Sequence, residues 1–169
     1  MDHEVTAAAI KVLDLCRARG LTVATAESCT GGLVSGALTE IAGSSDVVDR
    51  AFVTYSNAAK VAMLGVSQAT LDAVGAVSAE TAREMVAGLL KAAGTSLGVS
   101  VTGIAGPGGG SDAKPVGLVY FAAARAGGRM IERREVFAGQ DRSGVRRKAV
   151  LTALDMLAEL SADQASGRP

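Results

Sequence analysis

The chain has 169 residues with 17 basic and 17 acidic side chains, and 49% of its residues are hydrophobic although only 3% are aromatic. A chain of this length suits one domain with a mainly aliphatic core. The zero net charge argues against a general nucleic-acid or anionic-membrane binder, because such proteins carry a basic excess.

Helical and strand patterns alternate along the first half of the chain. We expect a helix over 5–16, a strand over 22–26, a turn over 28–32, a helix over 33–41, a strand over 50–55, and helices over 56–63, 67–74 and 78–93. Gly20, Gly75 and Gly94 stand where three of these helices should stop, and Ser56 is suited to cap the helix that it starts.

The second half continues the alternation. We expect a strand over 97–101, a glycine-rich loop over 102–114, a hairpin of strands over 116–125 and 130–137, and a last helix over 143–160. Interleaved helices and strands predict an α/β fold, a three-layer α/β/α sandwich with a mixed sheet. Residues 1–160 are expected to form one domain and residues 161–169 a flexible tail.

Residue counts narrow the chemistry. The single histidine, His3, lies at the start of the chain, which argues against histidine-based catalysis and histidine-bound metals. Two cysteines are too few for a four-cysteine zinc site. A catalytic base would therefore be a carboxylate, a lysine or a tyrosine, and we expect neither metal nor cofactor. The start of the chain has no signal-peptide pattern and no apolar run suits a membrane span, so we expect a cytoplasmic protein without membrane contact.

Two polar clusters follow predicted strands. Ser28 lies in a strand-to-helix turn, beside N–H groups that can hold an oxyanion, although a serine there is also a common helix cap. The second cluster contains Tyr55, Asn57 and Lys60, where a buried lysine with a lowered pKa would serve as a base. The simpler alternative is a solvated lysine on a helix surface.

Two further segments could bind a polar ligand. The loop from Thr102 to Gly110 offers backbone N–H groups to a phosphate but matches neither the Walker nor the Rossmann pattern, and a flexible turn is the alternative. Between Arg129 and Lys148 there are seven basic and three acidic residues. Arg142 and Arg146 lie here, four residues apart and so on one face of a helix. A guanidinium suits a phosphate monoester, whereas a solvated basic face is the simpler interpretation of the others.

Six strings occur in an order that resembles the CinA C-terminal domain family, the competence/damage-inducible proteins, which include nicotinamide-nucleotide amidases. The resemblance runs from about residue 5 to 160. It rests on Thr25-Ala-Glu-Ser-Cys-Thr-Gly-Gly, Ile41-Ala-Gly-Ser-Ser, Tyr55-Ser-Asn with Lys60, Gly75-Ala-Val-Ser, Thr102-Gly-Ile-Ala-Gly-Pro and Lys114-Pro-Val-Gly. It implies a three-layer α/β/α fold and hydrolysis of nicotinamide mononucleotide to nicotinate mononucleotide and ammonia, in pyridine-nucleotide recycling.

The resemblance also implies roles for individual residues. Ser28 would be the nucleophile, Lys60 its general base and Tyr55 a support for the pair. The residues implied to bind the nucleotide substrate are Thr30, Gly31, Gly32, Asn57, Thr102, Gly103, Gly106 and Arg142. The family run Phe-x-Gly-Asp-Arg has one extra residue here, Gln140, so Arg142 is aligned from its spacing to Val145 and Arg146.

The expected mechanism is acyl transfer, with the oxyanion held by N–H groups near residues 29–31 and with burial or nearby arginines lowering the pKa of Lys60. Two alternatives stay open. One is a nucleotide-binding module of the same fold without turnover. The other is a cysteine amidase using Cys29, although no histidine is at hand to ionise the thiol. The sequence leaves oligomeric state, including a homo-oligomer, undecided.

Overall fold

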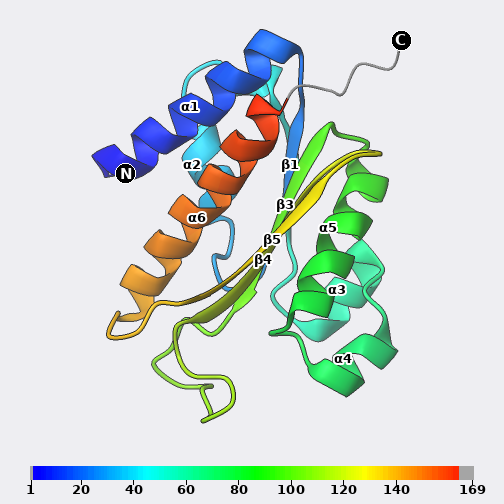
Figure 1. Cartoon of the computed structure of the whole chain (residues 1–169), viewed down its shortest axis with the longest axis vertical. Helices are drawn as coiled ribbons and strands as arrows, with labels where there is room; N and C mark the ends of the chain where they lie inside the picture. The colour runs from blue at the N-terminus through cyan, green and yellow to red at the C-terminus, as the bar shows by residue number, and fades with distance from the viewer. Residues whose placement is uncertain (1, 164–169) are drawn as a thin grey trace.

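The fold is one mixed sheet covered by helices on both faces, and the computed structural model describes residues 2–163 (Figure 1). The sequence-based expectation of an α/β sandwich with a mixed sheet is confirmed. The elements are α1 (His3–Arg19), β1 (Val23–Glu27), α2 (Leu33–Thr39), η1 (Ser44–Asp46), β2 (Val48–Val53), α3 (Asn57–Leu64), α4 (Gln68–Val74), α5 (Ala79–Ala93), β3 (Leu97–Gly103), β4 (Leu118–Arg125), β5 (Met130–Val136) and α6 (Arg142–Ala162). No helix among residues 2–163 is long and apolar enough to cross a membrane.

The strand order β2-β1-β3-β4-β5 contains a reversal at β1, because the chain runs from β1 outward to β2 and then back past β1 to β3. β1 pairs in parallel with both β2 and β3, whereas β4 and β5 continue the sheet as antiparallel strands. From β1 the chain passes through α2 to β2, and it then returns through α3, α4 and α5 on the opposite face to β3 (Figure 1). Ligands of open α/β sheets bind outside the carboxyl ends of strands at such a reversal.

Two hydrophobic cores lie on the two faces of the sheet because alternate strand residues point to opposite sides. One core contains Val23, Val99 and Phe121 and packs against α1, α2 and α6. The other packs against α3, α4 and α5, and its strand residues are small: Ala24, Ala26, Ala122 and Ala124. Small side chains let α5 approach closely; a Cβ added to Gly98 would lie 2.9 Å from Leu89 Cδ2.

Most helix ends fall where the sequence predicts them. Gly20 and Gly94 adopt left-handed conformations, with φ of 62° and 66°, at the ends of α1 and α5. The expected start of the tail at 161 is wrong, because α6 continues through Ala162. Ser161 is buried, and its Oγ donates to Leu157 O at 2.6 Å and lies 3.3 Å from Cys16 Sγ. The rest of the expected tail, 164–169, lies outside the described residues.

The second strand also differs from its prediction. β2 spans Val48–Val53 instead of 50–55, so Tyr55 follows the strand and is exposed. Val23 N–H donates to Val47 O at 2.8 Å and Thr54 N–H donates to Glu27 O at 2.8 Å, so pairing with β1 sets both ends of β2. The β-rich composition of this segment does not predict the register of its pairing with β1.

Candidate active site

Ser28 lies in a tight turn between β1 and α2. Its N–H donates to Val101 O at 2.9 Å, which fixes Ser28 at the end of β1 beside β3. Gly31 and Gly32 then take φ of 58° and 97°, a left-handed backbone that favours glycine. The turn reverses the chain within a few residues and places Ser28, 9% exposed, on the wall of a cavity.

Lys60 reaches Ser28 from the first turns of α3. Ser56 caps this helix as predicted, since its Oγ accepts the Ala59 N–H at 3.0 Å. The Lys60 side chain is 1% exposed, and its Nζ lies 3.0 Å from Ser28 Oγ and donates to Thr54 O at 2.8 Å. Burial lowers the pKa of Lys60 below its ordinary value of 10.5, and the neighbouring arginines are not the cause. The solvated lysine is therefore not what the structure contains.

Glu27 anchors the same turn from inside the protein. Its carboxylate is fully buried and accepts the N–H groups of Gly32, Val34 and Ser35 at 2.9–3.0 Å, as well as the Thr25 hydroxyl at 3.1 Å. A carboxylate at a helix N-terminus satisfies N–H groups that have no partner within the helix. The N-terminus of α2 is thus occupied by the protein's own anion, and it is not free to bind a phosphate.

The cavity beside Ser28 has a volume of about 290 Å³ and lies outside the ends of β1 and β3. Of the predicted residues it brings together Ser28, Tyr55, Asn57, Lys60, Thr102, Gly103, Gly106 and Arg142. Thr102 is buried and its hydroxyl donates to Ala76 O at 2.7 Å, which holds the loop before α5 against the cavity. Asn57 is exposed at the start of α3.

Arg142 closes one side of the cavity from the start of α6. Its Nη1 donates to Gly106 O and its Nη2 donates to the Tyr55 hydroxyl, both at 2.8 Å. Asp141 Oδ1 accepts the Gly144 N–H at 2.7 Å and caps the helix, so the additional Gln140 precedes the cap and leaves Arg142 in the site. Among residues 2–163, Tyr55 makes no hydrogen bond to Ser28 or Lys60, and its contact with Arg142 is the one that the structure contains.

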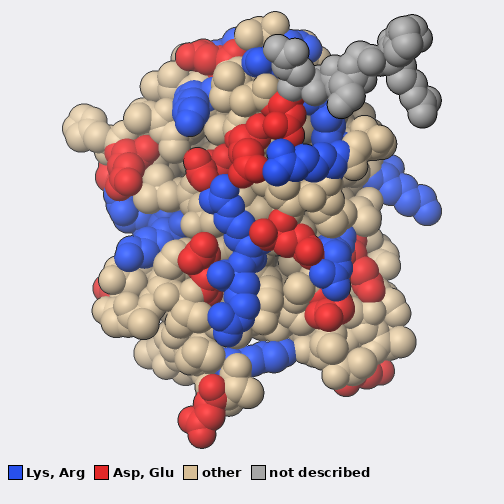
Figure 2. Space-filling view, in the orientation of Figure 1, with Lys and Arg blue, Asp and Glu red and all other residues tan. Residues whose placement is uncertain are grey.

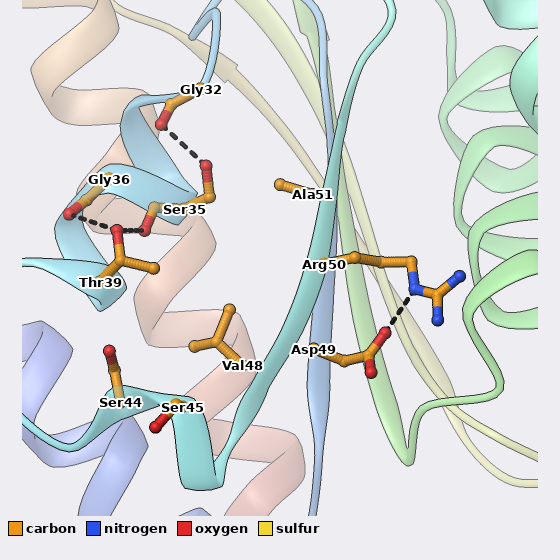
Figure 3. A pocket seen from close by; sticks show the side chains of 10 residues that line it. All are labelled: Gly32, Ser35, Gly36, Thr39, Ser44, Ser45, Val48, Asp49, Arg50 and Ala51. Carbon is orange, nitrogen blue, oxygen red and sulfur yellow. Dashed lines mark hydrogen bonds and ion pairs between the residues drawn. The ribbon is translucent and has the colours of Figure 1, made fainter.

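The remaining predicted binding residues, Thr30, Gly31 and Gly32, do not line the cavity. Thr30 is fully buried. The N–H of Gly31 donates to Ser28 O at 3.0 Å, so this N–H is not free to hold an oxyanion, contrary to the expectation for residues 29–31. Gly32 lines a different hollow, between α2, η1 and β2 (Figure 3). There the hydroxyls of Ser35 and Thr39 turn back to carbonyls of the same stretch of chain, so this hollow offers no group resembling the Ser28–Lys60 pair (Figure 3).

Sequence and structure comparisons agree on the family. Residues 5–161 match the CinA C-terminal domain. The chain belongs to the CinA C-terminal domain family. It is 53% identical over 156 residues to the nicotinamide-nucleotide amidohydrolase PncC of Escherichia coli K12, covering 92% of this chain and 94% of that protein. It is 49% identical over 146 residues to a CinA-like protein of Kosmotoga olearia, covering 86% of this chain and 35% of that protein.

Solved structures of CinA proteins share this fold. The competence/damage-inducible protein CihA of Agrobacterium tumefaciens superposes with a TM-score of 0.93 at 49% identity, over 95% of this chain and 97% of that one. The competence damage-inducible protein A of Klebsiella pneumoniae superposes with a TM-score of 0.89 at 39% identity, over 95% and 99%.

The basic segment of this CinA-family chain is partly neutralised, because three of its seven basic residues form salt bridges. Arg129 and Arg133 pair with acids in or directly after the C-terminal part of α6, and Arg147 pairs with Asp2 and Glu4. Basic and acidic side chains accordingly alternate over the viewed face of the molecule (Figure 2). Of this segment, Arg142 and Arg146 reach the cavity or the turn of Ser28, whereas Arg134 and Lys148 lie over the rings of Tyr120 and Phe137.

Sequence reasoning missed Glu27 as a functional candidate of this CinA-family site, and it grouped Arg146 with Arg142 as a guanidinium suited to a phosphate. Glu27 stands within the string that carries the resemblance, but nothing in the string shows where its carboxylate points. Arg146 contacts carbonyls of Cys29 and Thr30, more than 110 positions away along the chain. Among residues 2–163, no three His, Cys, Asp or Glu side chains lie close enough to hold a metal ion.

Proposed function

We propose that this protein hydrolyses the carboxamide of nicotinamide mononucleotide to nicotinate mononucleotide and ammonia, with Ser28 as nucleophile and Lys60 as general base. Membership of the CinA family and the similarity to PncC make the chain an amidohydrolase. The observation that carries the residue assignment is the buried Lys60 Nζ, 3.0 Å from Ser28 Oγ, with a lowered pKa.

The geometry suits a lysine base. A neutral amine has two N–H groups and one lone pair; one N–H of Lys60 donates to Thr54 O, and the lone pair is available to the Ser28 hydroxyl proton. Ser28 Oγ then attacks the carboxamide carbon, and the oxyanion is held by N–H groups of the turn. Protonated Lys60 gives its proton to the amide nitrogen of the tetrahedral intermediate, and the C–N bond breaks to release ammonia and leave the nicotinate ester of Ser28. Water, activated by the again neutral Lys60, hydrolyses the ester and releases nicotinate mononucleotide.

Cys29 is unsuited to the same role. It is 5% exposed, and burial raises the pKa of its thiol to about 11. The thiol is therefore protonated at neutral pH, and the nearest base is aligned with Ser28 instead.

Arg142 and the glycine-rich loop support a nucleotide substrate. Arg142 uses two of its five N–H groups for Gly106 and Tyr55, which leaves three donors for a phosphate. The cavity is at the small end of ligand pockets, and it is lined by backbone of Gly103, Gly106 and the loop beyond. A remote phosphate contact would place the carboxamide at Ser28 and so contribute to turnover as well as to binding. Such an activity would serve pyridine-nucleotide recycling.

The test measures ammonia released from nicotinamide mononucleotide by the purified protein. Ser28→Ala should lower kcat by about 10³-fold or more, as expected for a lost nucleophile, while Cys29→Ala keeps most of the activity. Lys60→Arg should be nearly as inactive as Lys60→Ala, because arginine keeps the charge but does not release a proton at usable pH. Turnover by Ser28→Ala at the wild-type rate would refute the assignment. A wild-type protein that binds the nucleotide without releasing ammonia would be a binding module.

A further inference from the structure

The turn that carries Ser28 is held through its carbonyl groups by one guanidinium. Arg146, one turn after Arg142 on α6, is half-buried and donates from Nε to Cys29 O and from Nη2 to Thr30 O, both at 3.1 Å. Ser28 O is also engaged, because it accepts the Gly31 N–H at 3.0 Å. Three successive carbonyls of the turn therefore have fixed directions.

Nearly every N–H group of the same turn is also taken. Gly32, Val34 and Ser35 donate to the Glu27 carboxylate, and Gly31 and Leu33 donate to carbonyls of the turn. Within residues 28–35, the N–H groups of Cys29 and Thr30 are the two that donate to no other residue of the described structure. Unpaired N–H groups directly after a nucleophile are the kind of donors that stabilise an oxyanion.

The directions of these two N–H groups follow from the carbonyls. A trans peptide is planar, and its N–H points opposite to its C=O. The Cys29 carbonyl points at Arg146, so the Thr30 N–H points away from Arg146. The Ser28 carbonyl points at the Gly31 N–H, so the Cys29 N–H points away from it. A guanidinium bound to a carbonyl also polarises that peptide, which makes its N–H a stronger donor.

We propose that Arg146 is a positioning residue that prepares two N–H groups for the oxyanion of the transition state: it aims and polarises the Thr30 N–H directly through Cys29 O, and it acts on the Cys29 N–H through Thr30 O and the Gly31 N–H bound to Ser28 O. This inference rests on the proposed function, because it requires an oxyanion formed at Ser28. Arg146 does not touch the substrate in this scheme. It acts through the backbone, and a planar fork with two donors is suited to hold two successive carbonyls where a lysine would hold one.

A charge without a carboxylate partner supports this role. Among residues 2–163, Arg146 forms no salt bridge, whereas its neighbour Arg147 pairs with both Asp2 and Glu4. Partial burial of a guanidinium without a carboxylate partner has a desolvation cost, and a neutral side chain could join α6 to the turn without that cost. Arg147 is therefore a matched control on the same helix, since its contacts lie with the first residues of the chain.

The test compares steady-state kinetics of Arg146→Ala, Arg146→Lys and Arg147→Ala on nicotinamide mononucleotide. Removal of one oxyanion donor lowers kcat by about 10²- to 10³-fold in other hydrolases, so loss of the aim of two donors should lower kcat by roughly 10²-fold. KM should change less than about threefold, because the ground-state carboxamide does not need the hole. Arg146→Lys should lie between wild type and Arg146→Ala, and Arg147→Ala should keep the wild-type kcat.

Chemical rescue separates positioning from a structural role. Millimolar guanidinium or methylguanidinium should restore part of the kcat of Arg146→Ala, whereas equal urea or sodium chloride should not. An unchanged kcat in Arg146→Ala, a loss confined to KM, or failure of rescue in a folded variant would overturn the inference. If Arg146→Ala does not fold, Arg146→Lys decides by the same split between kcat and KM. An inactive Ser28→Ala beside a fully active Arg146→Ala refutes this inference alone, whereas an active Ser28→Ala refutes the proposed function.

Discussion

Arg142 should distinguish the nucleotide from its dephosphorylated form. The acyl chemistry at the carboxamide is the same for nicotinamide mononucleotide and nicotinamide riboside, so discrimination must come from the phosphate. Arg142 lies on the cavity wall with three donors to spare after Gly106 and Tyr55 are satisfied. A hydrogen bond to a charged group contributes about 1.5–3 kcal/mol, which corresponds to roughly 10- to 150-fold in rate or affinity. Arg142→Ala should lower kcat/KM for the mononucleotide by about that factor.

The riboside and a second variant make this prediction decisive. Arg142 also joins Tyr55 to the glycine-rich loop, so its removal disturbs the cavity for every substrate. Tyr55→Phe deletes one of these contacts and keeps the guanidinium charge, so it should affect both substrates equally and by less than about tenfold. Ammonia release from both compounds is measured for both variants, and each rate is divided by that of the wild type to give four ratios. If Arg142→Ala reduces turnover of the riboside as much as that of the mononucleotide, Arg142 does not bind the phosphate.

Two buried charges lead to predictions on stability. Lys60→Met should abolish turnover yet raise the free energy of unfolding by about 1 kcal/mol at pH 7, because the folded state no longer buries an amine. The folded pKa of Lys60 is lowered, so between that pKa and 10.5 the unfolded wild type binds more protons and its stability rises with pH. The gain from Lys60→Met should therefore shrink toward pH 10 in urea titrations, and a gain independent of pH would contradict the cause given. Glu27→Gln should cost about 3 kcal/mol, because an amide cannot accept all the N–H groups that the carboxylate accepts, whereas Glu80→Gln on the exposed face of α5 should cost almost nothing in the same titrations.

The local parts of the site were predictable because they depend on neighbours in sequence. A buried strand followed by Ser28 and two glycines predicts a tight strand-to-helix turn, and the structure contains one. Ser56 before an apolar stretch predicts the cap of α3, which in turn sets the position of Lys60. The absence of a usable histidine left a carboxylate, a lysine or a tyrosine as the candidate base, and the resemblance to the CinA family then implied Lys60.

The predictions that failed concern features that depend on contacts between segments distant in the sequence. α6 continues to Ala162 because Ser161 is buried against Cys16, and helix propensities of the local sequence do not reveal this contact. The contacts of Arg146 with the turn of Ser28 depend on α6 lying across that turn, and the pairing of Arg133 with Asp155 and Glu159 depends on β5 lying beside α6. Charge counted along the sequence therefore overstated the basic patch, because its partners come from elsewhere.

One physical cause, burial, explains why Lys60 and Cys29 have pKa shifts in opposite directions. Burial disfavours the charged form of any group, but the charged form of an amine is the protonated one and that of a thiol is the deprotonated one. Burial at the same end of the sheet therefore lowers the pKa of Lys60, which suits it to the proposed role of base, and raises that of Cys29 to about 11, which keeps its thiol protonated at neutral pH. Ser28 needs no charge of its own before attack, only a neutral amine 3.0 Å from its Oγ. A serine and a buried lysine are thus a consistent solution for a site without histidine, whereas a cysteine in the same surroundings is not.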